Sequence, residues 1–571
     1  MEIEKLARKY AVKNAYEYGK ANVGSVLSKV ISKAPEAKAD MRALSALIGK
    51  VVDEVNSLDR SSLEEEYNGY ADEFGAEESA KRAASKPKFE LPGAVMGKVV
   101  TRFSPEPSGF MHIGHTKAAL IAETFARQYN GMFCLHFDDT NPENERQEFV
   151  DQFHKDLEWL GMGFDKEYYS SDHIEHIYSL AKRLIDKGSA YVCTCDRETI
   201  KKNRFDGREC EHRARQPAES LEMFEGMLNG DYEEEQAIVR FKYDMSHQNT
   251  TLRDPTMLRI KRATHYRQGD KYIVWPSYYF NTPIIDSVMG ITDAMRSKEY
   301  EQSEALYREI LSALGLRVPN IYAFSRLNIK GNITSKRKLR ALIKAGDISG
   351  YDDPRLMTIA ALRRRGVQPK AIRELMLNIG FSKAESVIDQ AALFAENRKI
   401  IDPIAKHLFF VSNPIKVVVE GTTQKDVRLK LHPHGRANEF REYRTNNTFY
   451  ISGSDAETIN PGESVRLKDL FDVQIETSTA NHIRARAASD EVNASIIHWV
   501  ADPYFVECSV SLPGDLLTDE EEYNPDSMKV EKGFVESYAR NLKKGDIVQF
   551  ERFGYAVLDD KERMDFIFIS K

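Results

Sequence analysis

The sequence predicts a multidomain protein in which an α/β domain with a parallel sheet is flanked by a helical N-terminal region and an all-β C-terminal region. The chain has 571 residues, more than one hydrophobic core accommodates, so three or more domains are expected. A strand–helix–strand pattern over residues 99–137 is typical of a parallel α/β sheet. Beyond Pro403, short strands separated by Gly, Pro, Asn and Asp recur, which indicates one or two β-barrels.

The N-terminal region, residues 1–84, is predicted to be a helical domain. Apolar residues recur there at steps of three and four over residues 22–58, with one break at Pro35. Residues 85–98 follow with two prolines, two glycines and no periodicity, so they are predicted to form a linker.

The α/β domain is predicted over residues 99–340. It begins with a strand over 99–103, a helix over 115–130 and a second strand that ends in carboxylates at 138–139. Ligands of parallel sheets bind beyond the carboxyl ends of the strands. Both the histidine-containing loop after the first strand and this acidic pair lie at such ends. Residues 341–400 then have helical spacing, and residues 401–571 have the all-β pattern.

Composition excludes several classes of protein. With 42% apolar and 30% charged residues, the chain has no apolar run long enough to span a bilayer, and its charged N-terminus lacks a signal-peptide core. Five cysteines are too few and too unevenly spaced for a disulfide framework, which favours a reducing cytoplasm. A net charge of −7 argues against indiscriminate nucleic-acid binding but permits a local basic face.

The stretch SGFMHIGHTKAAL (108–120) places His112 and His115 three residues apart at the predicted start of a helix. One interpretation is capping and packing. The other is an anion site, because helix N-termini present free N–H groups and the positive end of the helix dipole. The chain contains no G-x-G-x-x-G or G-x-x-x-x-G-K-[ST] motif, which argues against a dinucleotide site and a P-loop ATPase.

A second candidate element is the basic run from Arg326 to Lys344, which holds seven lysines or arginines and no acid. Such a run is usually a solvated basic face. Its small and polar residues, from Gly331 to Ser335, also suit a loop whose lysine closes over a triphosphate and neutralises developing charge.

The two elements together resemble the paired motifs of class I aminoacyl-tRNA synthetases, HIGH and an S-K-R loop some 220 residues later. TRFSPEPSGFMHIGHTKAAL, FDDTNPENE, WPSYYFNTPIIDSVMGITDAMRSKEYEQSEALY and ITSKRKL resemble the glutamyl/glutaminyl subgroup. IIHWV and GFVESYARNLKKGDIVQFERFGYAVLD are similar to the anticodon-binding barrels of glutaminyl and of archaeal and eukaryotic glutamyl enzymes. The resemblance covers roughly residues 97–571.

The resemblance implies a Rossmann-type catalytic domain with an acceptor-stem-binding insertion at about 190–275. It also implies a helical stem-contact region at 341–400 and two anticodon-binding barrels at 401–571. The implied reaction is ATP-dependent ligation of L-glutamate to tRNA(Glu) through glutamyl-adenylate.

The resemblance assigns catalysis to His112 and His115, which would donate hydrogen bonds to the α-phosphate, and to Lys336, which would hold the leaving pyrophosphate with Mg²⁺. Gly114 would leave room for the adenine or the ribose. The implied ATP-binding residues are Pro105, Gly109, His112, Gly114, His115, Ser335, Lys336 and Arg337.

Two positions depart from the family pattern. Ile333 stands where the closing loop usually has its first lysine, so Lys336 must carry the closing charge alone. His136 stands where an arginine often precedes the acidic pair, which puts the contact of that arginine in doubt.

The resemblance also implies the amino-acid site. Asp138 would bind the α-ammonium group and Tyr278 would add a hydroxyl, while the alternatives are a turn-initiating acid pair and core packing. Arg102 and Arg296 match the two arginines that approach the γ-carboxylate in glutamyl enzymes. Glutaminyl enzymes have a small uncharged residue at the second position, so Arg296 favours glutamate.

A cysteine-rich loop is a candidate zinc site. Cys193, Cys195, Cys210 and His212 form a C-x-C…C-x-H set, and thiolates with an imidazole suit a closed structural Zn²⁺ site. Some bacterial glutamyl enzymes have a similar set with a longer spacer. The alternative is four reduced residues in a loop.

Two rival functions remain: a glutaminyl-tRNA synthetase, and a non-catalytic tRNA-binding paralogue that the intact His112, His115 and Lys336 argue against. The sequence does not decide whether tRNA(Gln) is a second substrate. The expected partners are tRNA and glutamate, with no membrane, and the resemblance favours a monomer.

Overall fold

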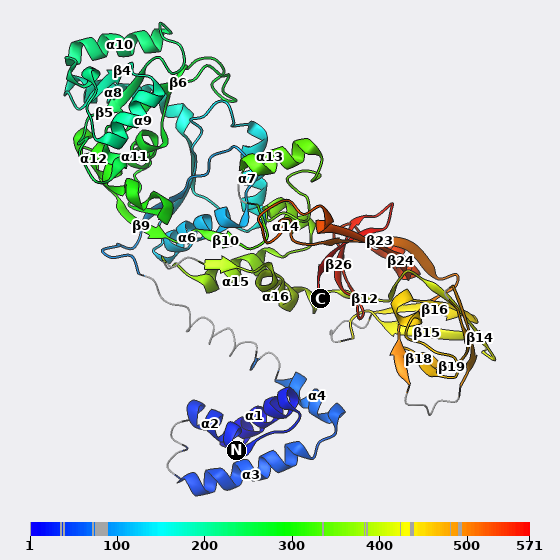
Figure 1. The fold of residues 1–571 in the computed structure, drawn as a ribbon. Helices are drawn as coiled ribbons and strands as arrows, with labels where there is room; N and C mark the ends of the chain where they lie inside the picture. Colours follow the sequence, from blue (N-terminus) through cyan, green and yellow to red (C-terminus); the bar gives the residue numbers. More distant parts are fainter. Residues whose placement is uncertain are drawn as a thin grey trace. The chain divides into compact units, whose positions relative to one another are not determined.

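Figure 1 shows the computed structural model of the chain, which describes residues 2–34, 37, 40–70, 73–74, 90–333, 336–381, 383, 386–422, 424–433, 439–479, 481–488 and 494–571. The chain divides into two compact units, Met1–Phe89 and Glu90–Lys571. In the described ranges every helix is too short or too polar to span a bilayer.

The N-terminal unit is helical, as predicted. Asn22, Asp40 and Asp59 cap three of its helices by accepting hydrogen bonds from backbone N–H groups three residues further on. The apolar faces that the spacing predicts meet in one core. The expected break at Pro35 lies outside the described residues. The helices are α1 (Glu2–Tyr18), α2 (Val23–Lys33), α3 (Met41–Asn56) and α4 (Arg60–Gly69).

The strand–helix–strand prediction for the second unit is confirmed. β1 (Val100–Phe103), β2 (Met132–Phe137) and β3 (Lys166–Tyr169) form a parallel sheet in that order. α6 (Ile113–Gln128) connects β1 to β2, and α7 (Gln147–Trp159) connects β2 to β3. Burial of nearly every residue of β1 and β2 explains their continuous apolar and β-branched sequence.

A second parallel pair lies on the other side of β1. β8 (Asp293–Ser297) pairs with β9 (Asn320–Phe324), and the Thr292 N–H donates to the Val100 carbonyl over 3.0 Å. Chain order therefore reverses between β1 and β8, which is where open α/β sheets bind their ligands. α11 (Tyr278–Val288) and α12 (Glu304–Leu314) flank this point.

Between β3 and α11 the chain forms an antiparallel sheet in the order β4–β5–β6–β7. Figure 1 shows this sheet with its helices in one lobe, at the cyan-to-green part of the chain. Its elements are α8 (Ile174–Asp186), β4 (Ala190–Cys193), α9 (Arg197–Asp206), α10 (Pro217–Asn229), β5 (Ile238–Phe241), β6 (Thr256–Ile260) and β7 (Val274–Pro276).

Four helices follow, which confirms the helical prediction for this stretch. The N-terminus of α14 is tied to the histidine-containing loop, because the Ile113 N–H donates to Met357 O and the Ile359 N–H to Met111 O. The elements are β10 (Leu327–Ile329), α13 (Lys336–Ala345), α14 (Ile359–Arg364), α15 (Pro369–Ile379), β11 (Ser386–Ile388) and α16 (Gln390–Ile401).

The C-terminal part is all-β, as predicted, with two barrel-like seven-stranded sheets that enclose separate cores. One sheet has the order β12–β25–β26–β27–β23–β24–β13 and the other β21–β18–β19–β20–β14–β17–β22. The strands are β12 (Lys406–Leu408), β13 (Phe410–Ser412), β14 (Ile415–Glu420), β15 (Lys425–Lys430), β16 (Phe440–Thr445), β17 (Thr448–Ile451), β18 (Ser464–Leu467), β19 (Phe471–Ser478), β20 (His482–Ala487), β21 (Ser495–Ile497), β22 (Val500–Ala501), β23 (Phe505–Pro513), β24 (Met528–Glu536), β25 (Ile547–Phe550), β26 (Gly554–Asp560) and β27 (Asp565–Ser570).

Candidate functional site

The two histidines of the HIGH sequence form the N-terminal cap of α6. His112 Nδ1 accepts from the N–H groups of Gly114 and His115 at 3.1 and 3.4 Å, and His115 Nδ1 accepts from the His112 N–H at 3.3 Å. The two rings stack with their centroids 3.7 Å apart. Because each Nδ1 accepts, this network assigns the proton of each neutral ring to Nε2.

This arrangement corrects one expectation about the helix N-terminus. The backbone N–H groups of Ile113, Gly114 and His115 are already hydrogen-bonded to Met357 O, His112 Nδ1 and His112 O, so they are not free for an anion. The capping interpretation therefore holds. It does not exclude anion binding, because the cap uses the Nδ1 atom of each imidazole and not the Nε2 atom.

Gly114 lies against the ring of His112. A Cβ at this position would lie 3.0 Å from Cε1 and Nδ1 of His112, so the capping imidazole would have to shift by a few tenths of an ångström. That Gly114 also leaves room for the adenine or the ribose stays a prediction.

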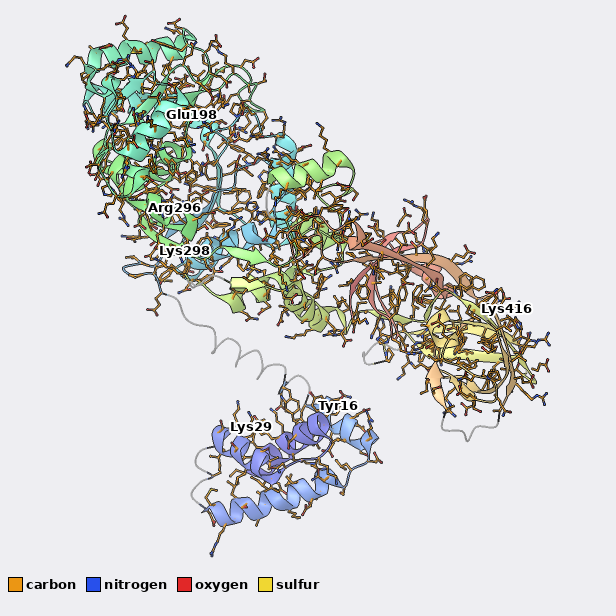
Figure 2. All side chains as sticks on the ribbon, in the orientation of Figure 1. Tyr16, Lys29, Glu198, Arg296, Lys298 and Lys416 are labelled. Carbon is orange, nitrogen blue, oxygen red and sulfur yellow. The ribbon has the colours of Figure 1, made fainter. Side chains whose placement is uncertain are left out.

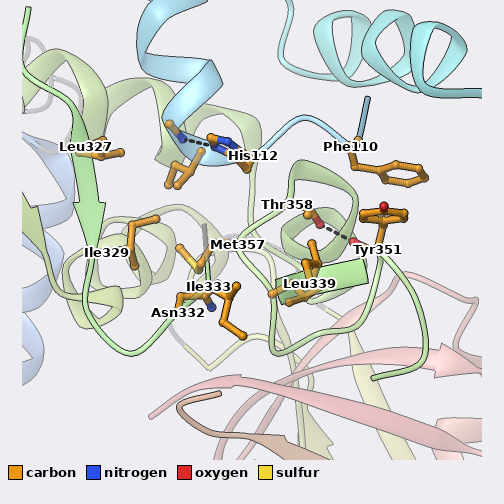
Figure 3. Close-up of a pocket in the computed structure, with 14 residues that line it drawn as sticks. Phe110, His112, Leu327, Ile329, Asn332, Ile333, Leu339, Tyr351, Met357 and Thr358 are labelled. Atoms are coloured by element: carbon orange, nitrogen blue, oxygen red, sulfur yellow. Dashed lines mark hydrogen bonds between the residues drawn. The ribbon is translucent and has the colours of Figure 1, made fainter. Parts of the chain in front are cut away.

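His112 and Gly114 line a small pocket of about 40 Å³, shown in Figure 3. Its walls are mostly apolar, with Leu327 and Ile329 of β10 on one side and Met357 below the histidine. At its far end Phe110 stacks on Tyr351, with the ring centroids 4.7 Å apart. Gly109, another predicted ATP-binding residue, lines the same pocket.

The basic loop is described only in part. Ser335 lies outside the described residues, and so does the side chain of Lys336, the first residue of α13. Arg337 is exposed, and Ile333 is buried at the position of the missing lysine. The expected closure over a triphosphate therefore stays a prediction.

Arg340 is a residue that the sequence analysis missed. Its guanidinium donates to Ser108 O at 2.6 Å and to Asn144 Oδ1 at 2.8 Å, so α13 is joined to both the histidine-containing loop and the acidic loop. The sequence did contain a signal for Arg340, because this residue lies one helical turn after Lys336 in the same basic run.

The acidic pair at the end of β2 divides into two environments. Asp139 is fully buried and accepts from the backbone and hydroxyl of Ser171 and from Tyr266, which is a structural role. Asp138 lines a cleft and accepts from Asn281 Nδ2 at 2.7 Å. Burial and the nearby Glu106 carboxylate raise the pKa of Asp138 to about 7.

Three hydrogen bonds hold the guanidinium of Arg102 on β1. Its Nε and Nη2 donate to the two carboxylate oxygens of Asp286 at 2.8 and 3.1 Å, and its Nη1 donates to Met295 O at 2.7 Å. Asp286 is buried on α11 and was not predicted as a site residue, although an acid inside an apolar helical stretch is a signal. The charge of Arg102 is thus already neutralised by the protein.

The surroundings of Arg296 on β8 differ from those of Arg102. It is 6% exposed, and the rings of Tyr278, Tyr300 and Tyr307 lie 5.1–5.8 Å from its Cζ. Its Nη2 donates to the hydroxyls of Tyr278 and Ser303 at 3.3 Å. Its buried Nε and Nη1 have no hydrogen-bond partner among the described residues.

All four predicted glutamate-binding residues line one cleft of about 530 Å³ at the reversal point between β1 and β8. Pro105 and His115 line it too, so one imidazole faces the same space as the two arginines. The four residues are Arg102, Asp138, Tyr278 and Arg296. Both cations and carboxylates line this cleft, which suits a ligand that carries both charges.

His136, which replaces the family arginine, contributes no charge to this cleft. It is fully buried between Ser104 Oγ at 3.1 Å and Ser170 Oγ at 2.8 Å. Burial lowers its pKa to about 3, so it is neutral at physiological pH.

The predicted cysteine cluster is assembled in the insertion. One ligand atom from each of its residues, Cys193, Cys195, Cys210 and His212, lies within 4.8 Å of all the others. In three of the pairs the ligand atoms lie 3.3–3.9 Å apart, close to the roughly 3.5–3.8 Å expected between ligands of a tetrahedral zinc site. The Arg240 guanidinium lies 3.9–4.0 Å from two of the sulfurs, which favours thiolates.

Comparison with known proteins gives consistent matches over the whole chain. Residues 98–403 match the catalytic domain of class I tRNA synthetases (E and Q), and residues 405–489 and 496–559 match the anticodon-binding domains of the same group. Glutamate–tRNA ligases from Pyrococcus furiosus and Thermococcus kodakarensis are each 40% identical, over 98% and 100% of both chains. The glutamate–tRNA ligase from Nitrosopumilus maritimus is 39% identical over 99% of both chains.

The cap geometry makes a prediction about local stability. His112→Ala removes the acceptor for the Gly114 and His115 amides, and loss of such a cap costs about 1 kcal/mol, so hydrogen exchange at these amides should quicken about fivefold. His112→Asn is the matched control, because asparagine caps helices well. Equal exchange rates in wild type and His112→Ala would show that the imidazole does not cap α6 in solution.

Proposed function

Because the chain belongs to the class I tRNA synthetases for glutamate and glutamine, we propose that the cleft between β1 and β8 is where it activates glutamate with ATP. The chain is a glutamate–tRNA ligase, as are its full-length relatives. The α-carboxylate of glutamate attacks the α-phosphate of ATP, and pyrophosphate leaves. A ribose hydroxyl of the terminal tRNA adenosine then takes the acyl group from the adenylate, and AMP leaves.

The observation that carries this proposal is the environment of Arg296. The Nε and Nη1 atoms of this buried guanidinium carry three N–H groups without a hydrogen-bond partner, tyrosine rings surround it, and no carboxylate among the described residues pairs with it. The γ-carboxylate of glutamate supplies both the charge and the acceptors. The amide of glutamine supplies only one acceptor oxygen and no charge, so it leaves the cation uncompensated.

Arg102 has a different role in this proposal. Asp286 neutralises its charge, but three hydrogen bonds leave two of its five N–H groups for the substrate. Arg102 would therefore orient the γ-carboxylate, while Arg296 compensates its charge. In the same cleft, Asp138 would bind the α-ammonium group and Tyr278 would contribute its hydroxyl.

No protein nucleophile is needed, so catalysis is positioning and charge stabilisation. The Nε2–H donors of His112 and His115 would meet the growing charge on the α-phosphate, and Lys336 would hold the leaving pyrophosphate. Mg²⁺ bound to ATP offsets phosphate charge. The residues proposed to contact ATP are Pro105, Gly109, His112, Gly114, His115, Ser335, Lys336 and Arg337.

The same proposal includes a structural Zn²⁺ ion on Cys193, Cys195, Cys210 and His212. Three thiolates and one imidazole would hold the ion, which would brace the loops on either side of α9. His212 Nε2 lies 3.1 Å from Thr194 Oγ1, a contact of the kind that orients ligating histidines.

The substrate RNA is proposed to be tRNA(Glu), contacted by an acceptor-stem-binding insertion at about 190–275 and by the barrels at 401–571. Five free cysteines support a reducing cytoplasm. From the resemblance to the family we also propose that the protein is a monomer. Whether it charges tRNA(Gln) as well is answered by an aminoacylation assay with that tRNA.

The function is tested by the choice between glutamate and glutamine. Aminoacylation by wild type should require glutamate. Arg296→Cys should lower the glutamate-to-glutamine ratio of kcat/KM on the order of a hundredfold or more. The reason is that the γ-carboxylate of glutamate loses both a charge-assisted hydrogen bond and its buried counter-ion. Lys298→Ala removes an exposed cation two residues away and should leave the ratio unchanged. Figure 2 labels both residues.

A wild type that prefers glutamine would support the glutaminyl alternative, and one that charges neither would support a binding paralogue. If Arg296→Cys keeps the wild-type ratio, the arginine does not face the γ-carboxylate.

The pKa of Asp138 predicts a pH dependence. Below about pH 7 this carboxylate gains a proton and loses its attraction for the α-ammonium group. The kcat/KM for glutamate should therefore fall up to tenfold per pH unit below pH 7 and level off above it. Asp138→Asn should be weakly active and independent of pH over this range. A wild-type profile that is flat between pH 6 and 8 would contradict the assignment.

The zinc proposal predicts about one metal ion per chain, retained through dialysis. Cys193→Ser combined with Cys195→Ser should abolish metal binding, whereas Cys508→Ala, at a cysteine in the C-terminal sheet, should not. Elemental analysis of protein purified without added zinc measures this. Metal-free wild type would show that the four residues are an ordinary loop cluster.

A further inference from the structure

A chain of polar side chains connects two residues of the cleft through the protein interior. Asn281 of α11 donates from Nδ2 to Asp138 Oδ1 and to Ser170 Oγ, at 2.7 Å each. Ser170 Oγ lies 2.8 Å from His136 Nε2, and His136 Nδ1 lies 3.1 Å from Ser104 Oγ. The three middle members of the chain are 0% exposed, whereas both of its ends line the cleft.

This chain joins the carboxyl ends of the three strands of the parallel sheet. Ser104 directly follows β1, Asp138 directly follows β2, and Ser170 directly follows β3. His136 is the last residue but one of β2, so its ring lies between the ends of the two neighbouring strands. The position of Asp138 therefore depends on all three strand ends and on α11.

The hydrogen bonds of the chain run in one direction. An ionised Asp138 only accepts, which places Nδ2 and not Oδ1 of Asn281 against it. Ser170 Oγ accepts from Asn281, so its own hydrogen donates to His136 Nε2, the acceptor that contacts it among the described residues. Nε2 is then unprotonated, and Nδ1–H donates to Ser104. Burial, which lowers the pKa of His136 to about 3, keeps Nε2 available as an acceptor.

We propose that His136 is a positioning residue, which through Ser170 and Asn281 holds the carboxylate that would bind the α-ammonium group of glutamate. The side-chain donors to Asp138, Asn281 and Thr140 at 3.3 Å, both reach Oδ1. Oδ2 has no side-chain donor among the described residues, so it is left for the ammonium group. The inference rests on the proposed function, since only glutamate activation brings an ammonium group to this cleft.

Histidine supplies at this position what the arginine of the family pattern does not. A guanidinium carries only donors, so it offers the hydroxyl of Ser170 no acceptor. The neutral imidazole accepts on one nitrogen and donates on the other, which is what a chain between two serines requires. The departure at His136 therefore changes the polarity of this hydrogen-bond chain as well as the charge.

The test compares two non-hydrolysable sulfamoyl analogues of glutamyl-adenylate, one with the α-amino group and one with a glutaryl group that lacks it. His136→Leu removes the acceptor for Ser170 and should weaken binding of the amino analogue about tenfold, because Asp138 is no longer held in place. The desamino analogue should keep its wild-type affinity. In steady state the KM for glutamate should rise about tenfold while kcat stays nearly unchanged.

Two conservative variants form a matched pair. Glutamine places Oε1 where His136 has Nε2, so His136→Gln should restore most of the affinity for the amino analogue. Asparagine reaches only the position of Nδ1, so His136→Asn should behave as His136→Leu. Ser220→Ala, at a buried serine of α10 outside the chain, is the control and should change neither affinity.

A second variant tests the relay itself. Ser170→Ala should reproduce the effects of His136→Leu, and the double variant should lose no more than either single variant, because both break the same chain. Thermal unfolding of each variant identifies the temperature at which all are folded and can be compared. Should His136→Leu fail to fold, Ser170→Ala carries the same comparison of the two analogues.

Three results would overturn the role of His136: equal weakening of both analogues, equal affinities of the glutamine and asparagine variants, or additive losses in the double variant. Failure of the proposed function is distinct from these. In that case wild type would charge no tRNA with glutamate, or would bind the two analogues equally tightly because Asp138 does not meet the ammonium group.

Discussion

A buried ion pair between Arg102 and Asp286 holds together the elements that form the cleft between β1 and β8. Arg102 comes from β1, Asp286 from α11, and the same guanidinium reaches Met295 O on β8. Tyr307 of α12 donates its hydroxyl to Asp286 at 2.8 Å, so a fourth element joins the same group. Breaking a buried pair of this kind typically costs 3–5 kcal/mol, because one charge is left without a partner.

The pair also determines how charge is distributed in the cleft. Asp286 neutralises Arg102, whereas Arg296 has no carboxylate partner among the described residues. Had both arginines been unpaired, the cleft would hold two buried like charges at a large desolvation cost. In the proposed function, one neutralised and one unpaired guanidinium would give strong hydrogen bonding with the charge of a single carboxylate, and this would separate glutamate from glutamine.

Distant parts of the chain hold both of the loops that are proposed to contact the nucleotide. The histidine-containing loop is hydrogen-bonded to the residues that begin α14, and Gly331, at the start of the basic loop, accepts from the N–H groups of Leu516 and Leu517 in the C-terminal part. Leu516 is fully buried in the same cluster as Ile333. The two loops therefore depend on segments more than 200 and 180 residues away in sequence, respectively.

The sequence by itself determined the strand–helix–strand unit, the all-β C-terminal part, the cysteine cluster and six of the residues that line the cleft. These follow from local periodicity, turn residues and motif spacing, which are properties of neighbouring residues. It did not determine that His112 caps α6, that Asp139 is structural while Asp138 faces the cleft, or that Asp286 neutralises Arg102. The last two outcomes depend on which atoms reach a given hydrogen-bond donor or counter-ion from distant parts of the chain. Only the tertiary structure decides such partnerships, because a buried charge or N–H group takes whichever partner the packing brings within about 3 Å.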